Sequence, residues 1–152
     1  MIKFESFRLF EMKKKQLISK AHKDRKQRVR QIDIKYDGAY LEDGILNIAF
    51  ITTTSKKGTT YNQLVQVLDV KEKVDKNNLL KSLRKNLKVD CSCSDYLYKG
   101  FKYIATVGEY AIEDEDIKPI ETNPDLEGTV CKHLLAILIN IEKYVPKILK
   151  DL

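Results

Sequence analysis

The 152-residue chain lacks the sequence features that define several large protein classes. No stretch approaches the ~18 consecutive apolar residues of a membrane-spanning helix, and the N-terminus has no apolar signal-peptide core. Cysteine is scarce, and the three cysteines cannot all pair, which excludes a disulfide framework. We therefore expect a protein that is neither secreted nor membrane-bound and that folds where thiols stay reduced.

The short motifs of common enzyme classes are also missing. The sequence contains no P-loop, no G-x-G-x-x-G, no H-E-x-x-H and no G-x-S-x-G. His22 lies in a basic segment and is more typical of a solvated or capping residue than of a catalyst. Cys131 and His133 have the chemistry of a nucleophile and a base, but the sequence implies no third group to orient them. We expect no enzymatic activity.

What the chain does contain is a pattern typical of an α+β fold. Alternating residues over 31–36 and β-rich runs over 45–53 and 59–70 predict an antiparallel β-meander. Turns are predicted at Gly38, at Asp43-Gly44 and at 55–58. Helices are predicted from Glu5 to about Arg30 and from a cap at Asp75 through Leu79, Leu80, Leu83 and Leu87.

Two tight pairs of metal-type residues stand out, Cys91-x-Cys93 and Cys131-x-His133. Residues i and i+2 of an extended strand point to one face, and the segment 88–93 has the pattern of a strand end. The alternative is a set of three small buried cysteines. The polar neighbours Asp90 and Ser92 argue against that alternative. Three cysteines and one histidine form a ligand set that closes a tetrahedral Zn²⁺ site, so we predict zinc as the cofactor.

The second pair opens a long apolar run, 134–141, which predicts a buried helix ending at Pro146. Thr129 is the expected N-cap of this helix. A helix N-terminus favours anionic sulfur, so we expect a lowered pKa at Cys131. The zinc ion would then join a strand end to a helix start.

This C-x-C…C-x-H pattern resembles the SWIM zinc finger, and the resemblance runs from about Val89 to Leu138. Cys91, Cys93, Cys131 and His133 match the four ligand positions, and Cys131-Lys132-His133-Leu134 matches the start of the family's helix. The resemblance implies that the first pair lies at the end of a β-hairpin and that the second opens an α-helix. The 37 residues between Cys93 and Cys131 exceed the spacing in most members.

The long insert at 94–130 carries a second, looser resemblance. A Cys-x-Cys-x-Asp-aromatic-x-Tyr pattern, a later Asn-Pro and then Cys-Lys-His-Leu are similar to a SWIM-like type found in proteins of tailed bacteriophages. An alternative interpretation explains the residues of the insert without any relation to phage proteins. In it the aromatic residues Tyr96, Tyr98, Phe101 and Tyr103 pack over the metal site, and Asn123-Pro124 forms a turn.

These resemblances lead to two functional hypotheses. The first is a non-enzymatic zinc-binding structural subunit of a tailed-phage virion, in the head, portal or neck region. Such a subunit would sit in an oligomeric assembly, contact other subunits and packaged DNA, and be found in the virion or the host cytoplasm. The alternative is an intracellular SWIM-type adaptor that binds DNA or a protein partner. In both we expect one domain over 1–152, with a basic helix (1–31), a β-meander plus helix (32–90) and a zinc module (91–152).

The net charge of +6 is concentrated near the N-terminus. Such a density of cations can neutralise phosphates, so the predicted basic helix is a candidate contact for nucleic acid or for an acidic subunit. The alternative is a solvated helix face in a lysine-rich chain. The candidate contact residues are Lys13, Lys14, Lys15, Lys20, Lys23, Arg25, Lys26, Arg28 and Arg30.

Overall fold

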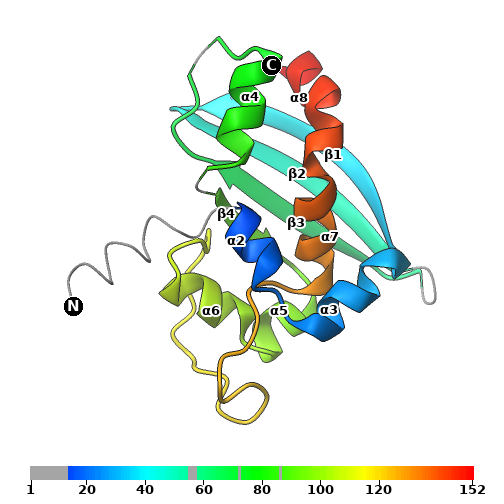
Figure 1. Ribbon diagram of the computed structural model, residues 1–152, viewed down its shortest axis with the longest axis vertical. Coiled ribbons are helices and arrows are strands. Elements are labelled where there is room, and N and C mark those ends of the chain that lie inside the picture. Colours follow the sequence, from blue (N-terminus) through cyan, green and yellow to red (C-terminus); the bar gives the residue numbers. More distant parts are fainter. Residues whose placement is uncertain (1–13, 55–57, 72, 86) are drawn as a thin grey trace.

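A four-stranded antiparallel sheet forms the framework of the computed structural model (Figure 1), which describes residues 14–54, 58–71, 73–85 and 87–152. The strands lie in chain order, so each neighbour in the sequence is also a neighbour in the sheet. The predicted α+β class is confirmed. The strands are β1 (Ile32–Glu42), β2 (Ile45–Thr54), β3 (Thr60–Val67) and β4 (Leu87–Cys91).

The structure confirms the turn predicted at Asp43-Gly44 and contradicts the one predicted at Gly38. Asp43 and Gly44 have φ angles of 52° and 79° and connect β1 to β2, as their sequence predicts. Gly38 does not end a strand, because β1 continues through it. The β1–β2 register slips between Tyr36 and Ala39, and Gly38, at φ 113°, lies in this bulge. Most of the turn predicted at 55–58 lies outside the described residues.

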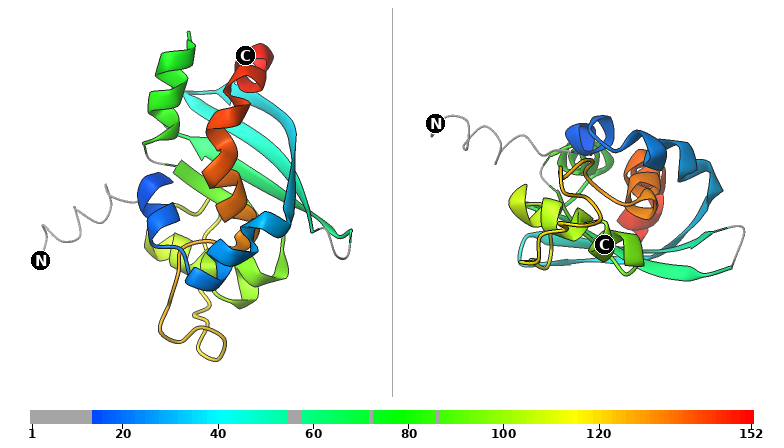
Figure 2. Two further views of the ribbon diagram at one scale, coloured as in Figure 1. Left: turned by 45° about the vertical axis from the view of Figure 1, so that its right-hand side comes forward. Right: turned by 90° about the horizontal axis from the view of Figure 1, so that it is seen from below.

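Helices cover one face of the sheet, as the views from two sides show (Figures 1 and 2). They are α4 (Lys76–Leu83), α7 (Lys132–Asn140) and α8 (Val145–Asp151). The strands alternate so that Ile48, Phe50 and Val65 are buried beneath these helices. No helix within the described ranges has the length and apolarity needed to cross a membrane.

Local signals explain where α4 begins and why the C-terminal helix continues. The carboxylate of Asp75 accepts a hydrogen bond from the backbone N–H of Asn78 at 2.7 Å, which is the predicted cap. Leu87, predicted to extend this helix, belongs to β4 instead.

Pro146, which the sequence predicts to end the last helix, lies in the first turn of α8, after the 3₁₀ turn Ile141–Tyr144. Proline is tolerated there because a first-turn N–H has no partner within the helix.

The single basic helix predicted up to Arg30 is wrong over its described part. The chain forms two short helices, α2 (Lys14–Ser19) and α3 (Lys23–Arg28), followed by the 3₁₀ turn Val29–Gln31. The ring Nδ1 of His22 accepts a hydrogen bond from the backbone N–H of Asp24 at 3.1 Å, which starts a new helix. The earlier part of the predicted helix lies outside the described residues.

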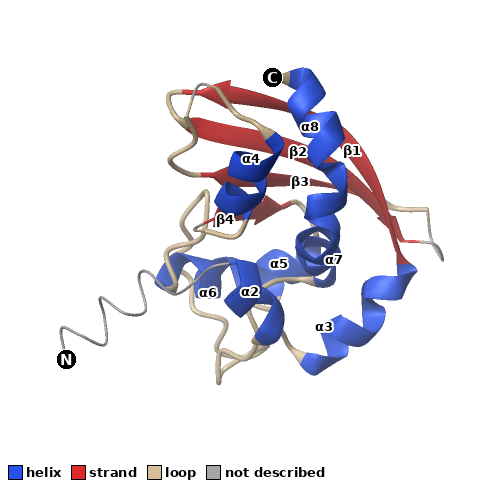
Figure 3. Ribbon diagram, turned by 45° about the horizontal axis from the view of Figure 1, so that its top comes forward, coloured by secondary structure: helices blue, strands red, loops and turns tan. Residues whose placement is uncertain are grey.

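The insert at 94–130 packs at one end of the sheet and is mostly loop apart from two short helices (Figure 3). These are α5 (Ser94–Tyr98) and α6 (Phe101–Val107). After α6 the chain returns to the free edge of β4. There Val89 donates its N–H to the carbonyl of Tyr110 at 2.8 Å and accepts one from Ile112 at 3.1 Å.

Candidate metal centre

The structure brings the four predicted ligands together. Cys91, Cys93, Cys131 and His133 are all buried, and their ligand atoms lie within 4.8 Å of one another. Around a tetrahedral zinc ion with Zn–S bonds of ~2.3 Å, the sulfur atoms lie about 3.8 Å apart. The cluster is therefore compatible with one metal ion at its centre.

The ligands come from three elements that begin or end at the same place. Cys91 is the last residue of β4, and Cys93 is the N-cap of α5. Cys131 is the N-cap of α7, with His133 in that helix's first turn. The predicted cap, Thr129, instead donates its hydroxyl to the carbonyl of Leu17 at 2.6 Å. A metal ion here would join the sheet, the insert and α7.

Two of the three thiols have shifted pKa values, and the pattern differs from the predicted one. Hydrogen bonds from Cys131 and then Cys93 lower the pKa of Cys91 to about 4. Burial, followed by the hydrogen bonds with Cys91 and Cys93, raises the pKa of Cys131. The lowering expected at Cys131 from the helix N-terminus is therefore wrong, because burial in the cluster outweighs the helix dipole.

A glutamine supports the cluster from the neighbouring strand. Gln63 on β3 pairs with Cys91 across the β3–β4 ladder, and its Nε2 lies 3.5 Å from the Cys91 sulfur. The same amide donates to the hydroxyl of Thr52 at 2.7 Å, which fixes its direction. Sequence reasoning missed Gln63, because the β3–β4 register that brings it to Cys91 is set by pairing across 28 residues.

His133 provides the sharpest test of whether the cluster fits a metal. Its imidazole is buried beside the ring of Tyr61, with ring centroids 4.8 Å apart. Neither ring nitrogen has a hydrogen-bond partner among the described residues. Buried polar atoms are normally satisfied, so an unpartnered imidazole beside three sulfurs calls for a further group. A metal ion bound to one nitrogen satisfies that requirement.

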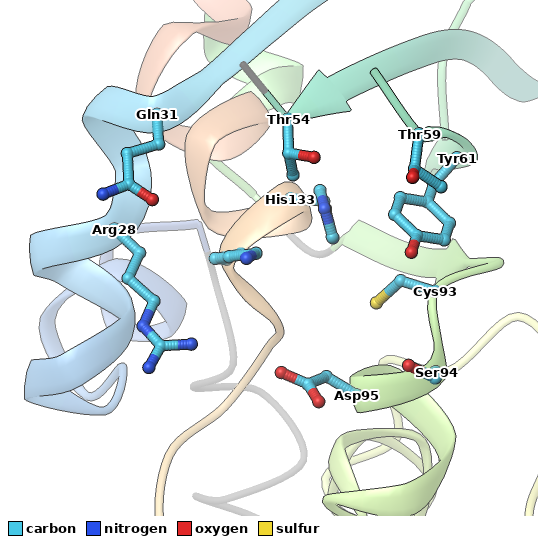
Figure 4. A pocket seen from close by; sticks show the side chains of 10 residues that line it. Arg28, Gln31, Thr54, Thr59, Tyr61, Cys93, Ser94, Asp95 and His133 are labelled. Carbon is cyan, nitrogen blue, oxygen red and sulfur yellow. The ribbon is translucent and has the colours of Figure 1, made fainter. Parts of the chain in front are cut away.

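The cluster is not sealed from solvent on every side. A pocket of about 330 Å³ lies in front of it, between the end of α3 with the following 3₁₀ turn, the end of the β2–β3 hairpin, α5 and the start of α7 (Figure 4). Cys93 and His133 form part of its wall, together with Arg28 and Asp95. The other lining residues are polar or aromatic: Gln31, Thr54, Thr59, Tyr61, Ser94 and Lys132.

The predicted basic contact residues fall into two groups. Lys14 and Arg25 are buried and serve the fold. Lys14 is paired with Glu142, while Arg25 binds Asp24 at 2.6 Å and Asp95 at 3.2 Å and lies over the ring of Phe101. Lys13 lies outside the described residues. The exposed members are Lys15, Lys20, Lys23, Lys26, Arg28 and Arg30, and their contact with a partner stays a prediction.

The aromatic residues of the insert divide in the same way. Tyr96 is buried and donates its hydroxyl to the carbonyl of Val89 at 3.2 Å, and Phe101 is also buried. Tyr98, by contrast, is 67% exposed. Burial in the core is therefore found for Tyr96 and Phe101 but not for Tyr98, and Tyr103 is half-buried. That these side chains pack over the metal site stays a prediction.

Comparison with known families agrees with the geometry of the cluster. The model of the SWIM zinc finger family matches residues 65–102 and 125–142. These two stretches contain β4, α5, α7 and all four residues of the cluster, and they leave most of the insert unmatched. No curated protein and no solved structure matches the chain. The chain is thus similar to SWIM zinc fingers over the part that builds the cluster.

Proposed function

We propose that this chain is a non-enzymatic zinc-binding protein in which the ion has a structural role. The observation that carries the proposal is the buried Cys₃His cluster, with ligand atoms within 4.8 Å and a His133 imidazole that has no hydrogen-bond partner among the described residues. Thiolate and imidazole ligands suit zinc, whereas oxygen ligands suit magnesium and calcium. Cys91, Cys93, Cys131 and His133 are the proposed ligands.

A structural role follows from the number of ligands. Four protein ligands complete a tetrahedral zinc ion, while catalytic zinc keeps one position for water or substrate. Asp95, an acid that lines the pocket, is bound to the buried guanidinium of Arg25. It is therefore poorly placed to act as a general base, which favours a non-enzymatic role.

Metal content of the purified protein tests the proposal. Native mass spectrometry should find one zinc ion per chain, and both Cys93→Ser and His133→Gln should lose it. The exposed neighbour variant Ser94→Ala and the variant of the other histidine, His22→Gln, are matched controls that should retain zinc. An unchanged zinc content in His133→Gln, or no bound zinc in the original chain, would contradict the proposed site.

The phage hypothesis extends this proposal to a subunit of a virion. Its support is the insert pattern, together with the exposed apolar side chains Leu97, Tyr98, Ile117 and Ile120 of the insert, which suit contact with another chain. Light scattering tests it through the molar mass. A defined oligomer supports a virion subunit, whereas a monomer with salt-sensitive DNA binding through the exposed cations supports the adaptor alternative.

A further inference from the structure

A second basic surface lies around α4, and none of its lining residues belongs to the Cys₃His cluster. The loop after β3 and one side of α4 enclose a pocket of about 140 Å³. Four lysines line it, and we call it the lysine pocket: Lys71, Lys73, Lys81 and Lys85, with Asn78, Ser82, Asp69, Val70 and Val74. Figures 1 and 3 show that α4 and α3 lie at different ends of the molecule. This pocket is thus separate from α3, the later part of the predicted basic segment.

The charge of the lysine pocket is strongly one-sided. Among the lining residues that the structure describes, Asp69 is the only acid. Within the described ranges none of its four lysines lies in an ion pair. Over the whole stretch 69–85 the sequence has six cations and three acids. The acid Asp75 is engaged in capping α4, and the cation Arg84 is paired with Glu142.

The positions of the polar groups favour an anion of small size. Lysines from the loop and from α4 face the same space, and Asn78 and Ser82 add neutral hydrogen-bond donors from successive turns of α4. Clustered like charges repel one another, so a bound anion stabilises this arrangement. The volume accommodates one or two phosphate groups but not a large organic ligand, since pockets for such ligands begin at about 300 Å³.

We propose that the lysine pocket binds phosphate groups, with Lys81 and Lys85 as charge partners. The phosphate has two possible sources, a small phosphate compound or the backbone of a nucleic acid, and both present the same oxyanion. Lysines act on phosphates as point charges, so binding is independent of base sequence. This inference stands apart from the proposed zinc site, because no lining residue belongs to the metal cluster.

Binding of inorganic diphosphate to the zinc-loaded chain tests the proposal by calorimetry at low salt. The double variant Lys81→Gln/Lys85→Gln should weaken binding by about tenfold or more, because it removes two charge-assisted contacts. The double variant Lys23→Gln/Lys26→Gln is the matched control, since it removes the same charge from exposed positions on α3. It should bind diphosphate with unchanged affinity.

A fluorescent single-stranded oligonucleotide distinguishes the two sources. If the Lys81/Lys85 variant loses oligonucleotide binding and diphosphate competes for it, the phosphate belongs to a nucleic acid. If only diphosphate binds, the ligand is a small phosphate compound. Equal weakening in both double variants would show a general charge effect and overturn the proposal, as would the absence of any diphosphate binding. Zinc content, measured in each variant, reports separately on the metal site.

Discussion

The sheet with its helices and the insert at 94–130 are held together in different ways. Under α4, α7 and α8 the sheet buries a continuous set of aliphatic and aromatic side chains, among them Phe50, Leu79 and Leu135. The insert contributes fewer side chains to this core, among them Tyr96, Phe101 and Tyr110, and additional anchors hold it. These are the Cys₃His cluster at both of its ends, where the proposed metal would bind, Arg25 against Asp95 and Phe101, and Asn123, whose amide binds the carbonyls of Lys99 and Glu127.

This difference predicts how much of the structure should be affected when one contact is lost. Many small contacts together stabilise the sheet, so the loss of one side chain removes only a fraction of the free energy of unfolding. The insert depends on a few strong contacts, so losing one of them should release a whole segment. The following predictions test this contrast, beginning with the largest expected effect.

Removing the metal should affect the insert first. Structural zinc binding contributes on the order of 10 kcal/mol of folding free energy, which is the scale of a whole domain's stability. After chelation we expect amide hydrogen exchange to rise sharply over 94–130 while the amides of β1, β2 and β3 stay protected. If both regions lost protection together, the chain would be one cooperative unit and the contrast would fail.

The same substitution in the two regions should have unequal effects. Leu79 is fully buried on α4, whereas Leu97 is 44% exposed on α5. Leu79→Ala should lower the free energy of unfolding by about 3 kcal/mol, because it removes buried methyl groups and leaves a cavity. Leu97→Ala should change it by less than about 0.5 kcal/mol. Urea denaturation of both variants checks this, and equal losses would contradict it.

Arg25 should behave as an anchor of the insert despite its charge. Arg25→Met keeps most of the side-chain length but leaves the carboxylates of Asp24 and Asp95 without their buried partner. We expect a loss of about 2 kcal/mol, below the full cost of breaking a buried pair because both acids are partly exposed. Lys26→Met, its exposed neighbour on α3, is the control. An equal loss of stability in the two variants would mean that Arg25 contributes no more to the fold than a solvent-exposed cation does.

The ion pair between Lys14 of α2 and Glu142 of the 3₁₀ turn Ile141–Tyr144 should make the stability of the protein depend on pH. Hydrogen bonds from Arg84 and then Lys14 lower the pKa of Glu142 from 4.5 to about 2. A carboxyl whose pKa is lowered on folding stabilises the protein above its unfolded pKa and loses that contribution as the pH falls. Glu142→Gln should therefore cost about 1 kcal/mol at pH 7, after allowance for solvent screening.

The measurement is the difference in unfolding free energy between Glu142→Gln and the original chain as the pH is lowered. This difference should shrink between pH 4.5 and about 2, the window of the lowered pKa. Acid release of the metal affects both chains alike and cancels in the difference. Glu121→Gln, at an exposed glutamate, is the control and should show no such trend. A difference independent of pH would assign the effect to packing.

The parts of the fold that the sequence predicted depend on local chemistry. The i, i+2 spacing of Cys91 and Cys93 and the pairing of Cys131 with His133 are short-range patterns, and they were sufficient to locate the cluster. Asp75 as a helix cap and Asp43-Gly44 as a turn are equally local. Each uses a side chain or backbone preference that acts within three residues.

The parts that the sequence could not predict depend on distant partners. The burial of Lys14 and Arg25 follows from Glu142 and Asp95, which lie far along the chain. The strand assignment of Leu87 requires β3 beside it, and Gln63 reaches Cys91 only through that pairing. Helix propensity over the basic segment gave no sign that His22 would cap a second helix.

Because the proposed metal ligands lie at both ends of the insert, they also bear on how much the length of the chain between them can change. A metal that binds both pairs acts as a cross-link that closes a loop of 37 residues. The entropy of closing a flexible loop grows only with the logarithm of its length, so doubling this loop costs about 0.6 kcal/mol. The exposed stretch Asp116–Lys118 is therefore a point where the chain can accept an additional segment, even a small domain, while the closure of the loop is preserved.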